Sequence, residues 1–295
     1  MTVTLAMRFV VAGTAQDRTI NSDRNITVTI LGTGTPFVDA ERFGAAVLVD
    51  AGGKKLLFDC GRGVVIRLKQ AGISPEQIDG LFLTHLHSDH VVGIPDLWLS
   101  GWFGGRKAPL KMWGPAGTQG LAEHLGKAFA FDIETRSSHG FPREGAIIDA
   151  QEVEDGGLYE VGPVRVTAFR VDHGLVKPAF GYRVDHGGHS VVISGDTNFS
   201  ENLVKFSKGT DCLIHASWST SMKDDTPASR RSIATAEDAA RVFSAVIPKL
   251  AVIYHYFDAA GQADAIRAGY RGRFVIGRDL MRIEISSTVT LYQPK

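Results

Sequence analysis

The sequence predicts an α/β fold in which two sheets pack together and helices cover their outer faces. Two observations support this prediction. Apolar segments of strand length recur along the chain between turns that contain glycine or proline. Segments with helical periodicity follow a set of strands in the first half of the chain and again in the second half. Helices on the outside would cover the sheet faces that do not pack against the other sheet.

The first half begins with a β-branched, alternating segment that a glycine-rich turn at 32–36 ends. Its next two strands flank residues 51–53 and form a predicted hairpin. The region 131–160 has scattered charge and no clear apolar period, so we expect loop with short strands there. In order, the elements expected before this region are strands at 26–31, 45–50 and 55–58, a helix at 64–71, a strand at 80–83, and helices at 95–103 and 118–130.

The second half repeats this arrangement in outline. One helix opens with a capping-box pattern at Thr235. The elements expected here are strands at 164–171, 181–184, 190–193 and 212–215, a helix at 235–247, a strand at 250–254, a helix at 259–269, and strands at 274–276 and 281–285.

The chain contains no linker or internal repeat, so we expect one domain over residues 26–295, preceded by an N-terminal extension over 1–25. Residues 1–15 are apolar apart from Arg8 and end in small residues. They fit either the remainder of a secretory signal or a plain extension, which leaves cytoplasmic and periplasmic locations open. No run of about 18 apolar residues exists, so we expect no membrane span.

The composition is that of an ordinary globular protein, with 44% hydrophobic and 22% charged residues. Lys plus Arg and Asp plus Glu both number 32, which gives a formal net charge of zero. Proteins that bind nucleic acids usually show a basic excess. The balance therefore argues against a nucleic-acid partner. The sequence leaves a homodimer possible, and a small-molecule substrate is predicted from the residues discussed below. Cys60 and Cys212 form neither a disulfide framework nor a metal-ligand spacing.

The most informative motif is H-x-H-x-D-H, directly after the apolar strand at 80–83. Alternate side chains of an extended chain point to the same side, so the first three ligand-type residues can converge. Imidazole and carboxylate groups suit Zn²⁺, and a catalytic site keeps one position open for water. The motif supplies His85, His87, Asp89 and His90.

Three further candidates lie at the ends of later strands, namely His173, Asp196 and His255. Taken singly, a histidine at a strand end is more often structural than ligating. An aspartate in such a turn is commonly a helix cap or turn former. They can therefore be assigned as ligands only if the fold places them next to other ligand-type side chains.

These residues, in this order, resemble the metallo-β-lactamase superfamily and, within it, the ribonuclease Z-like branch. The resemblance runs from about Ile26 to the C-terminus. It includes L-G-T-G-T-P at 31–36, D-C-G at 59–61 and S-G-D-T at 194–197. It implies an αββα metallo-β-lactamase sandwich of two packed mixed sheets, with the site on the open edge.

The resemblance also implies a dinuclear metal centre with two Zn²⁺ per chain, although Mn²⁺ or Fe²⁺ would suit the same ligands. Its ligand assignment places His85, His87 and His173 on one ion. Asp89, His90 and His255 bind the other, and Asp196 bridges them.

The expected mechanism is hydrolysis by a hydroxide that bridges the two ions, since two cations lower the pKa of a shared water toward about 7. Asp89 would act as a catalytic residue by orienting that hydroxide or accepting its proton. Asp59 would fix a ligand histidine from behind.

The sequence departs from the ribonuclease Z pattern at the groups that protonate the leaving oxygen. The family's His-Glu-Ala-Thr becomes His-Ala-Ser-Trp at 215–218, and its later His-Ser-Thr aligns with Ile-Ala-Thr at 233–235. The family's tRNA-gripping arm does not fit between His173 and Asp196. We therefore expect a small substrate with a good leaving group, such as an aryl ester, lactone, sulfate, organophosphate or halogenated aromatic.

Two alternatives remain at this point. One is a phosphodiesterase or ribonuclease Z-like nuclease, as in the branch that the sequence resembles. The other is a metal-bound scaffold without turnover, which a complete ligand set disfavours.

Two tryptophans are candidates for a substrate-binding wall. Trp102 lies on the helix after the metal motif and shares a face with Trp98, four residues earlier. Core packing would explain that spacing equally well. Trp218 follows His215, at the position where the ribonuclease Z pattern has its proton-transfer string.

Overall fold

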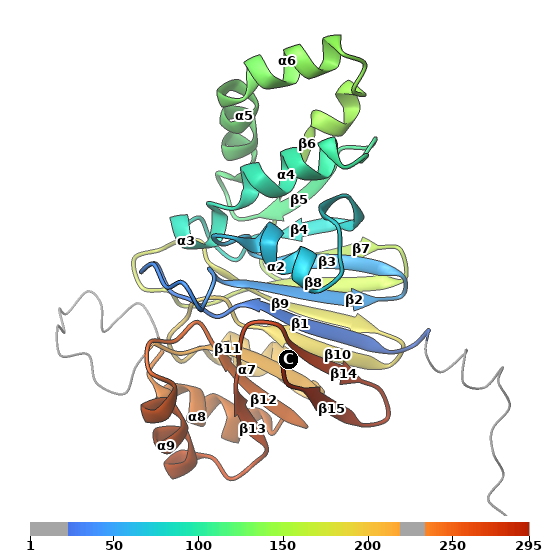
Figure 1. Ribbon diagram of the computed structural model, residues 1–295. Coiled ribbons are helices and arrows are strands. Elements are labelled where there is room, and N and C mark those ends of the chain that lie inside the picture. Colours follow the sequence, from blue (N-terminus) through green and yellow to red (C-terminus); the bar gives the residue numbers. More distant parts are fainter. Residues whose placement is uncertain (1–22, 219–233, 295) are drawn as a thin grey trace, which may run out of the picture.

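The computed structural model describes residues 23–218 and 234–294. They form two sheets that lie face to face, with helices outside both (Figure 1). The predicted αββα class is confirmed. Residues 1–22 lie outside the described part, so the prediction of an N-terminal extension with a signal remnant stays a prediction.

The first sheet, counted over the described residues, has eight strands. Its N-terminal hairpin and C-terminal strands pair antiparallel, whereas β3 to β6 run parallel. In spatial order the strands are β15 (Val289–Tyr292), β14 (Met281–Ile285), β1 (Ile26–Gly32), β2 (Ala46–Ala51), β3 (Lys54–Phe58), β4 (Gly80–Phe82), β5 (Leu110–Gly114) and β6 (Ile148–Glu152).

The second sheet has seven strands within the same described ranges. Its first four run parallel, and the remaining three pair antiparallel. In spatial order they are β13 (Phe274–Ile276), β12 (Leu250–Tyr254), β11 (Cys212–Ala216), β10 (His189–Ile193), β9 (Phe180–His186), β8 (Val164–Arg170) and β7 (Leu158–Val161).

The main core lies between the two sheets. On β1, the alternate residues Ile26, Val28 and Ile30 are fully buried in it, as the period of two in a strand requires. The second sheet contributes Val166 and Val184, which are fully buried in the same cluster. Each such side chain contributes about 1.5–3 kcal/mol on burial. The register of both sheets is therefore fixed by their apolar faces.

Helices cover the outer faces of both sheets (Figure 1). On the second sheet, Phe243 packs in a cluster with strand residues such as Leu213 and Ile253. The helices on this side are α7 (Glu201–Ser207), α8 (Ala236–Val246) and α9 (Ala259–Gly269). The predicted cap at Thr235 is present, since its side chain accepts a hydrogen bond from the Asp238 backbone at 3.3 Å.

On the first sheet, Leu68 and Leu97 pack against strand residues such as Leu57. The helices belonging to this side are α2 (Val64–Gln70), η1 (Pro75–Gln77), α3 (Ser88–Val91), α4 (Ile94–Phe103), α5 (Thr118–Ala128), α6 (Ala130–Ser138) and η2 (Arg143–Ala146). We call α4, α5, α6 and η2 the upper helices, because they stand above the sandwich in Figure 1.

The prediction of loop with short strands over 131–160 was wrong in its first part. Residues 130–138 form α6 and 143–146 form η2, before strands β6 and β7. Only Ile133 of α6 is buried, so the sequence lacks the apolar stripe that announces a helix. An ion pair between Asp132 and Arg136, one turn apart, joins two of its half-buried positions.

None of the helices that the structure describes is both long enough and apolar enough to cross a membrane.

Candidate metal centre

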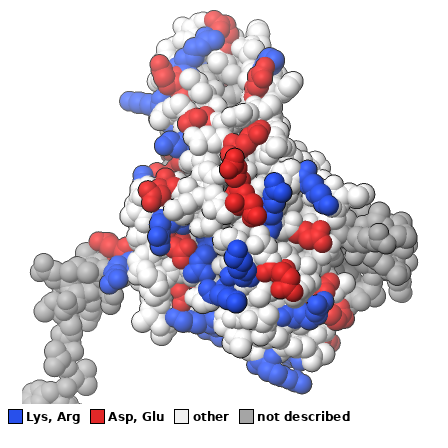
Figure 2. Space-filling model, turned by 180° about the vertical axis from the view of Figure 1, so that it is seen from behind, with Lys and Arg blue, Asp and Glu red and all other residues white. Residues whose placement is uncertain are grey.

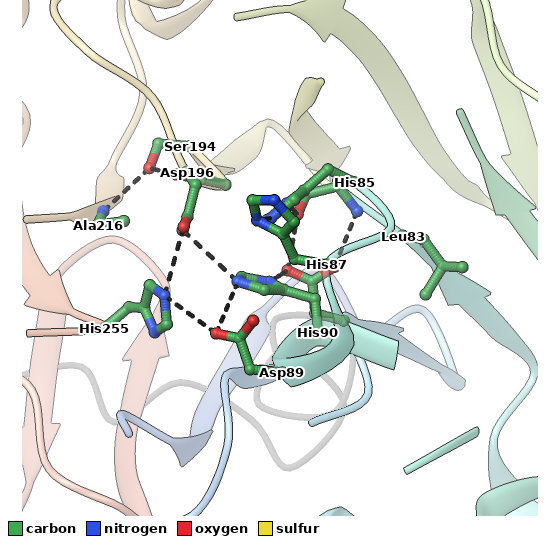
Figure 3. Close-up of polar contacts among 12 residues, drawn as sticks. Leu83, His85, His87, Asp89, His90, Ser194, Asp196, Ala216 and His255 are labelled. Atoms are coloured by element: carbon green, nitrogen blue, oxygen red, sulfur yellow. Dashed lines mark hydrogen bonds and ion pairs between the residues drawn. The ribbon is translucent and has the colours of Figure 1, made fainter. Parts of the chain in front are cut away.

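The predicted ligands come from loops at the ends of strands in both sheets. His85 and His87 follow β4 of the first sheet, and the chain then turns into α3, which carries Asp89 and His90. The second sheet supplies the other three side chains, from the loops after β8, β10 and β12: His173, Asp196 and His255. The structure brings all seven predicted side chains together at one edge of the sandwich, and Figure 3 shows six of them.

The donor atoms fall into overlapping groups whose members all lie within 4.8 Å of one another. One group joins His85, His87 and His173, and another joins Asp89, His90 and His255. Asp196 lies between them. Its Oδ1 is 3.7 Å from His90 Nε2, and its Oδ2 is 3.4 Å from His255 Nε2 and 3.9 Å from His173 Nε2.

Four of these side chains form a closed ring of contacts, drawn in Figure 3: Asp196, His255, Asp89 and His90. The spacings round the ring are 3.4, 3.6, 3.6 and 3.7 Å. These are too long for good hydrogen bonds. They are close to the roughly 3.3 Å that separates two ligands about 2.0–2.1 Å from a tetrahedral zinc ion. The ring therefore has the dimensions of a metal site.

Unpaired polar atoms point to the same conclusion. Among the described residues, buried atoms without a hydrogen-bond partner include Asp89 Oδ2, His90 Nε2, Asp196 Oδ1 and His255 Nε2. Leaving a buried polar atom unpaired costs about 1–3 kcal/mol. All four atoms belong to the ring, and a divalent cation would satisfy them together. The residues present fit a metal.

Asp59 holds His90 in place from behind. Its Oδ2 accepts a hydrogen bond from His90 Nδ1 at 2.8 Å, which turns Nε2 of the ring toward the centre. The same carboxylate accepts bonds from the backbone N–H and the hydroxyl of Thr84, at 2.8 and 2.9 Å. This is the position that the predicted role of Asp59 requires.

The turn after β1 orients His255 in a similar way. His255 Nδ1 donates to the carbonyl oxygen of Gly34 at 2.7 Å, so its Nε2 faces the ring. A Cβ on Gly34 would lie 2.6 Å from the carbonyl oxygen of Phe43, so only glycine allows this approach. The glycine-rich turn at 32–36 thus has a structural reason to accompany the histidine motif.

The charges of the cluster suit cation binding. Burial holds the pKa of His85 well below its usual value and lowers that of His87, so both rings are neutral near pH 7. Burial alone would raise the pKa of Asp196, but His255 and His90 outweigh it and keep that pKa well below the ordinary value. His87 is exposed, whereas the other six ligand candidates are buried, so the cluster opens to solvent on the His87 side.

His90 is the exception among these histidines. Burial favours its neutral form, but the charges of Asp59 and Asp196 prevail and raise its pKa to about 9. Without a metal, His90 therefore carries a proton near neutral pH. A cation must displace that proton before it can bind Nε2.

Trp102 does not belong to the site, so the prediction that it lines a substrate wall was wrong. Its side chain is 1% exposed and packs in a separate cluster with Leu110 and Ala146. Its indole N–H donates to the carbonyl oxygen of Pro142 at 2.8 Å. The spacing of four from Trp98 reflects the core of the upper helices.

Trp218 does lie beside the cluster, with its ring centroid 6.2 Å from that of His255. Two residues that sequence reasoning missed accompany it. Phe257 meets Trp218 edge-on at 4.8 Å, and Phe37 lies 5.5 Å from Phe257. The sequence offered one signal that could have identified Phe257 as a neighbour of the site, namely its position two residues after His255. Phe37 follows the glycine-rich turn that orients the same histidine.

Ala216 occupies the position that carries a glutamate in ribonuclease Z, and the next residue is Ser217. Its hydroxyl donates to Gln262 Oε1 at 2.8 Å, and Gln262 Nε2 donates back to the Ser217 carbonyl at 2.8 Å. His215 is buried and meets Phe243 edge-on, and burial lowers its pKa to about 4. Neither Ser217 nor His215 can act as a carboxylic acid toward a leaving group.

Fold and side-chain cluster together define a metal-dependent hydrolase of the metallo-β-lactamase fold. More specifically, the chain belongs to the family described as Anti-Pycsar protein Apyc1, whose sequence profile matches residues 26–269.

The chain is also similar to proteins named Ribonuclease Z. One, from Mycolicibacterium gilvum (strain PYR-GCK), is 36% identical over 275 residues, which are 88% of this chain and 96% of the relative. Another, from Mycobacterium marinum (strain ATCC BAA-535 / M), is 34% identical and covers 88% and 99%. The resemblance to the ribonuclease Z-like branch is therefore confirmed.

Solved structures confirm the fold. YhfI from Bacillus subtilis, a metallo-beta-lactamase fold protein, superposes with a TM-score of 0.71 at 19% identity, over 89% of this chain and all of that one. The short form of human tRNase Z has a TM-score of 0.67 at 24% identity and covers 87% and 98%.

These relatives overturn the prediction against a nucleic-acid substrate, because a ribonuclease acts on RNA. The prediction relied on a net charge of zero. A whole-chain sum does not report how charges are distributed over the surface. Figure 2 shows basic and acidic side chains interspersed over one face, with local groups of either sign. A balanced total is therefore compatible with local binding of a polyanion.

Proposed function

We propose that this protein is a phosphodiesterase that uses two Zn²⁺ ions to hydrolyse a phosphodiester bond in RNA or in a nucleotide. The observation that carries the proposal is the convergence of seven ligand-type side chains, with Asp196 between two groups. The ribonuclease Z relatives favour a phosphodiester over the esters, lactones and sulfates that the sequence alone suggested.

The ligand assignment follows the groups of donor atoms. His85, His87 and His173 would hold one ion, and Asp89, His90 and His255 the other. Asp196 would be shared, because its two oxygens face different histidines. When bound, such a pair of cations would lower the pKa of water, so that hydroxide is available at neutral pH, and would polarise the phosphoryl oxygen.

Asp89 is the residue that we assign to orienting the attacking water. Its Oδ2 faces His90 and His255, each at 3.6 Å. The other carboxylate oxygen is left for a hydrogen bond to the water, or to accept its proton. Burial of Asp89 at 5% exposure keeps that oxygen in a fixed position.

Release of the leaving oxygen has less help in the described part of the chain than in ribonuclease Z. Ser217 is tied to Gln262 and has no acidic proton to give. We therefore expect phosphodiesters with acidic leaving groups, such as nitrophenolates, to react faster than those with alkoxides. This makes a nitrophenyl diester the appropriate first substrate.

The test is hydrolysis of bis(p-nitrophenyl) phosphate by zinc-loaded protein, in parallel with a short RNA that carries a 3′ extension. The wild type should release p-nitrophenolate, and His87→Ala should lose that activity. His124→Ala is the matched control, because His124 lies on α5 outside the cluster. Turnover of neither substrate by protein that holds its metal would contradict a phosphodiesterase.

A further inference from the structure

A group of aromatic rings, two of them exposed, adjoins the metal centre on the side of His255. Phe257 lies two residues beyond this histidine, and Trp218 is in contact with both, at centroid distances of 4.8 and 6.2 Å. Phe37 reaches the same place from the turn after β1, at 5.5 Å from Phe257. Three segments that are far apart in sequence thus bring rings together at one point.

The outer two rings of this group are open to solvent. Phe37 is 68% exposed and Phe257 is 41% exposed. Burying a phenylalanine side chain stabilises a protein by about 1.5–3 kcal/mol, so both positions forgo much of that gain. Exposed apolar groups that are contiguous and lie next to a polar site commonly mark a binding surface.

The backbone holds these rings in place. The backbone N–H of Phe257 donates to the Trp218 carbonyl at 3.0 Å, and that of Trp218 donates to Ala234 at 3.1 Å. Arg42 donates to the Tyr256 carbonyl at 2.6 Å, and its guanidinium lies 4.5 Å from the Tyr256 ring centroid. The loop that carries Phe37 is therefore tied to the loop that carries Phe257.

The position of the rings beside His255 allows a phosphodiester at the metal centre to direct one of its substituents toward this surface. In a nucleotide the substituent carries a flat, aromatic base, and stacking of a base on an aromatic side chain contributes about 1–3 kcal/mol whatever the base. An aliphatic substituent would gain no such contact. The chemistry of the surface therefore matches a nucleobase.

We propose that Phe37 and Phe257, with Trp218 packed edge-on against Phe257, form a stacking platform for the nucleobase next to the scissile phosphate. The inference rests on the proposed phosphodiesterase function and specifies which residues contact the base of its substrate. The base can come from a mononucleotide diester or from an RNA chain, since both present the same ring to the platform.

The experiment compares two diesters with the same leaving group: thymidine 5′-(p-nitrophenyl phosphate) and methyl p-nitrophenyl phosphate. Thymidine lacks the 2′-hydroxyl, which excludes self-cleavage. We expect the wild type to prefer the thymidine ester in kcat/KM. In Phe37→Ala and in Phe257→Ala that preference should fall about 5- to 150-fold. A ratio of two substrates is independent of how much variant protein is folded.

Phe131→Ala is the matched control, because Phe131 is 86% exposed but lies on α6 among the upper helices. A second readout is calorimetric binding of 5′-thymidylate to the zinc-loaded protein, which does not require turnover. An RNA with one abasic nucleotide beside its cleavage site then separates the sources. A loss of cleavage that depends on Phe37 assigns the platform to RNA, and its absence assigns it to mononucleotides.

The proposal is overturned if the wild type does not distinguish the two esters, or if neither phenylalanine variant changes the ratio or the binding of thymidylate. Failure of the metal-loaded protein to hydrolyse either ester would instead contradict the phosphodiesterase function itself. The two failures are therefore distinguishable.

Discussion

The metal centre and the upper helices both contain buried polar atoms that lack hydrogen-bond partners within the described residues, but the atoms differ in kind. In the centre they include Asp89 Oδ2 and Asp196 Oδ1, which are acceptors that converge with histidine nitrogens. In the upper helices and the loop after α4 they are Trp98 Nε1 and two nitrogens of Arg106, which can only donate, together with the hydroxyl of Ser137. A cation satisfies the converging acceptors of the centre, whereas the donor groups of Trp98 and Arg106 would repel it. Unpaired buried polar atoms thus indicate a metal site only where several hydrogen-bond acceptors lie close together.

The largest expected effect comes from Asp196→Ala. This change removes the carboxylate that faces both ligand groups, so both metal positions should weaken. We expect hydrolysis of bis(p-nitrophenyl) phosphate to fall more than the roughly 10- to 100-fold that follows loss of a ligand's hydrogen-bonding partner. Steady-state kinetics at saturating zinc measures the change. Activity within twofold of the wild type would contradict the assignment of Asp196 as a shared metal ligand.

Next in size is the pH dependence of the metal-free protein. His90 has its pKa raised from 6.5 to about 9 by Asp59 and Asp196 against the effect of burial. The folded state then holds a proton that the unfolded state releases above pH 6.5. This contribution is complete below pH 6.5 and is lost as pH rises through 9. Through His90, the unfolding free energy should therefore fall as the pH rises between these values.

Urea denaturation of metal-stripped protein at pH 6.5 and 8.5 tests this expectation. In Asp59→Asn the slope should be shallower, because the nearest negative charge has gone. A free energy of unfolding that is constant or rises over this interval would show that His90 is not protonated in the folded metal-free state.

Asp59→Asn should also weaken metal binding at the His90 group by about 10- to 100-fold, as loss of a ligand's partner generally does. Competition with a chromophoric zinc chelator measures the affinity. Asp132→Asn supplies the control, since Asp132 pairs with Arg136 on the surface of α6. Equal affinities in the wild type and Asp59→Asn would mean that the bond to His90 Nδ1 does not position this ligand.

The smallest effect belongs to Trp102→Phe in the upper helices. The change removes the hydrogen bond to Pro142 and should lower the unfolding free energy by about 0.5–1.5 kcal/mol. Because Trp102 lies in a separate cluster, kcat/KM should stay within about twofold of the wild type. A selective loss of activity without loss of stability would place Trp102 in the function of the site after all.

The ligands could be predicted from sequence because chemistry restricts them. Only a few residue types bind metals, and His85, His173 and His255 all follow apolar segments that read clearly as strands. Strand ends at one edge of a sandwich converge, so local pattern and fold class together imply a cluster. Asp59 was located through the resemblance instead, which supplied a role that a single carboxylate does not reveal.

The residue type of an aromatic side chain does not restrict it to one role, as it does for metal ligands. The spacing between Trp98 and Trp102 suits a core and a pocket equally, and only the packing of the upper helices decides between them. The contact between Phe37 and Phe257 joins positions that no local period relates. Helix α6 escaped prediction for a related reason, since Ile133 alone is buried and an amphipathic pattern needs several such positions.

The most direct test of the metal-centre assignment is the zinc content of the purified protein after loading and removal of excess metal, measured by mass spectrometry. We expect about two ions per chain in the wild type, as a two-metal hydrolase requires, and fewer in Asp196→Ala. Wild-type protein that retains no metal under these conditions would contradict the assignment of the cluster as a metal centre, and the proposed mechanism with it.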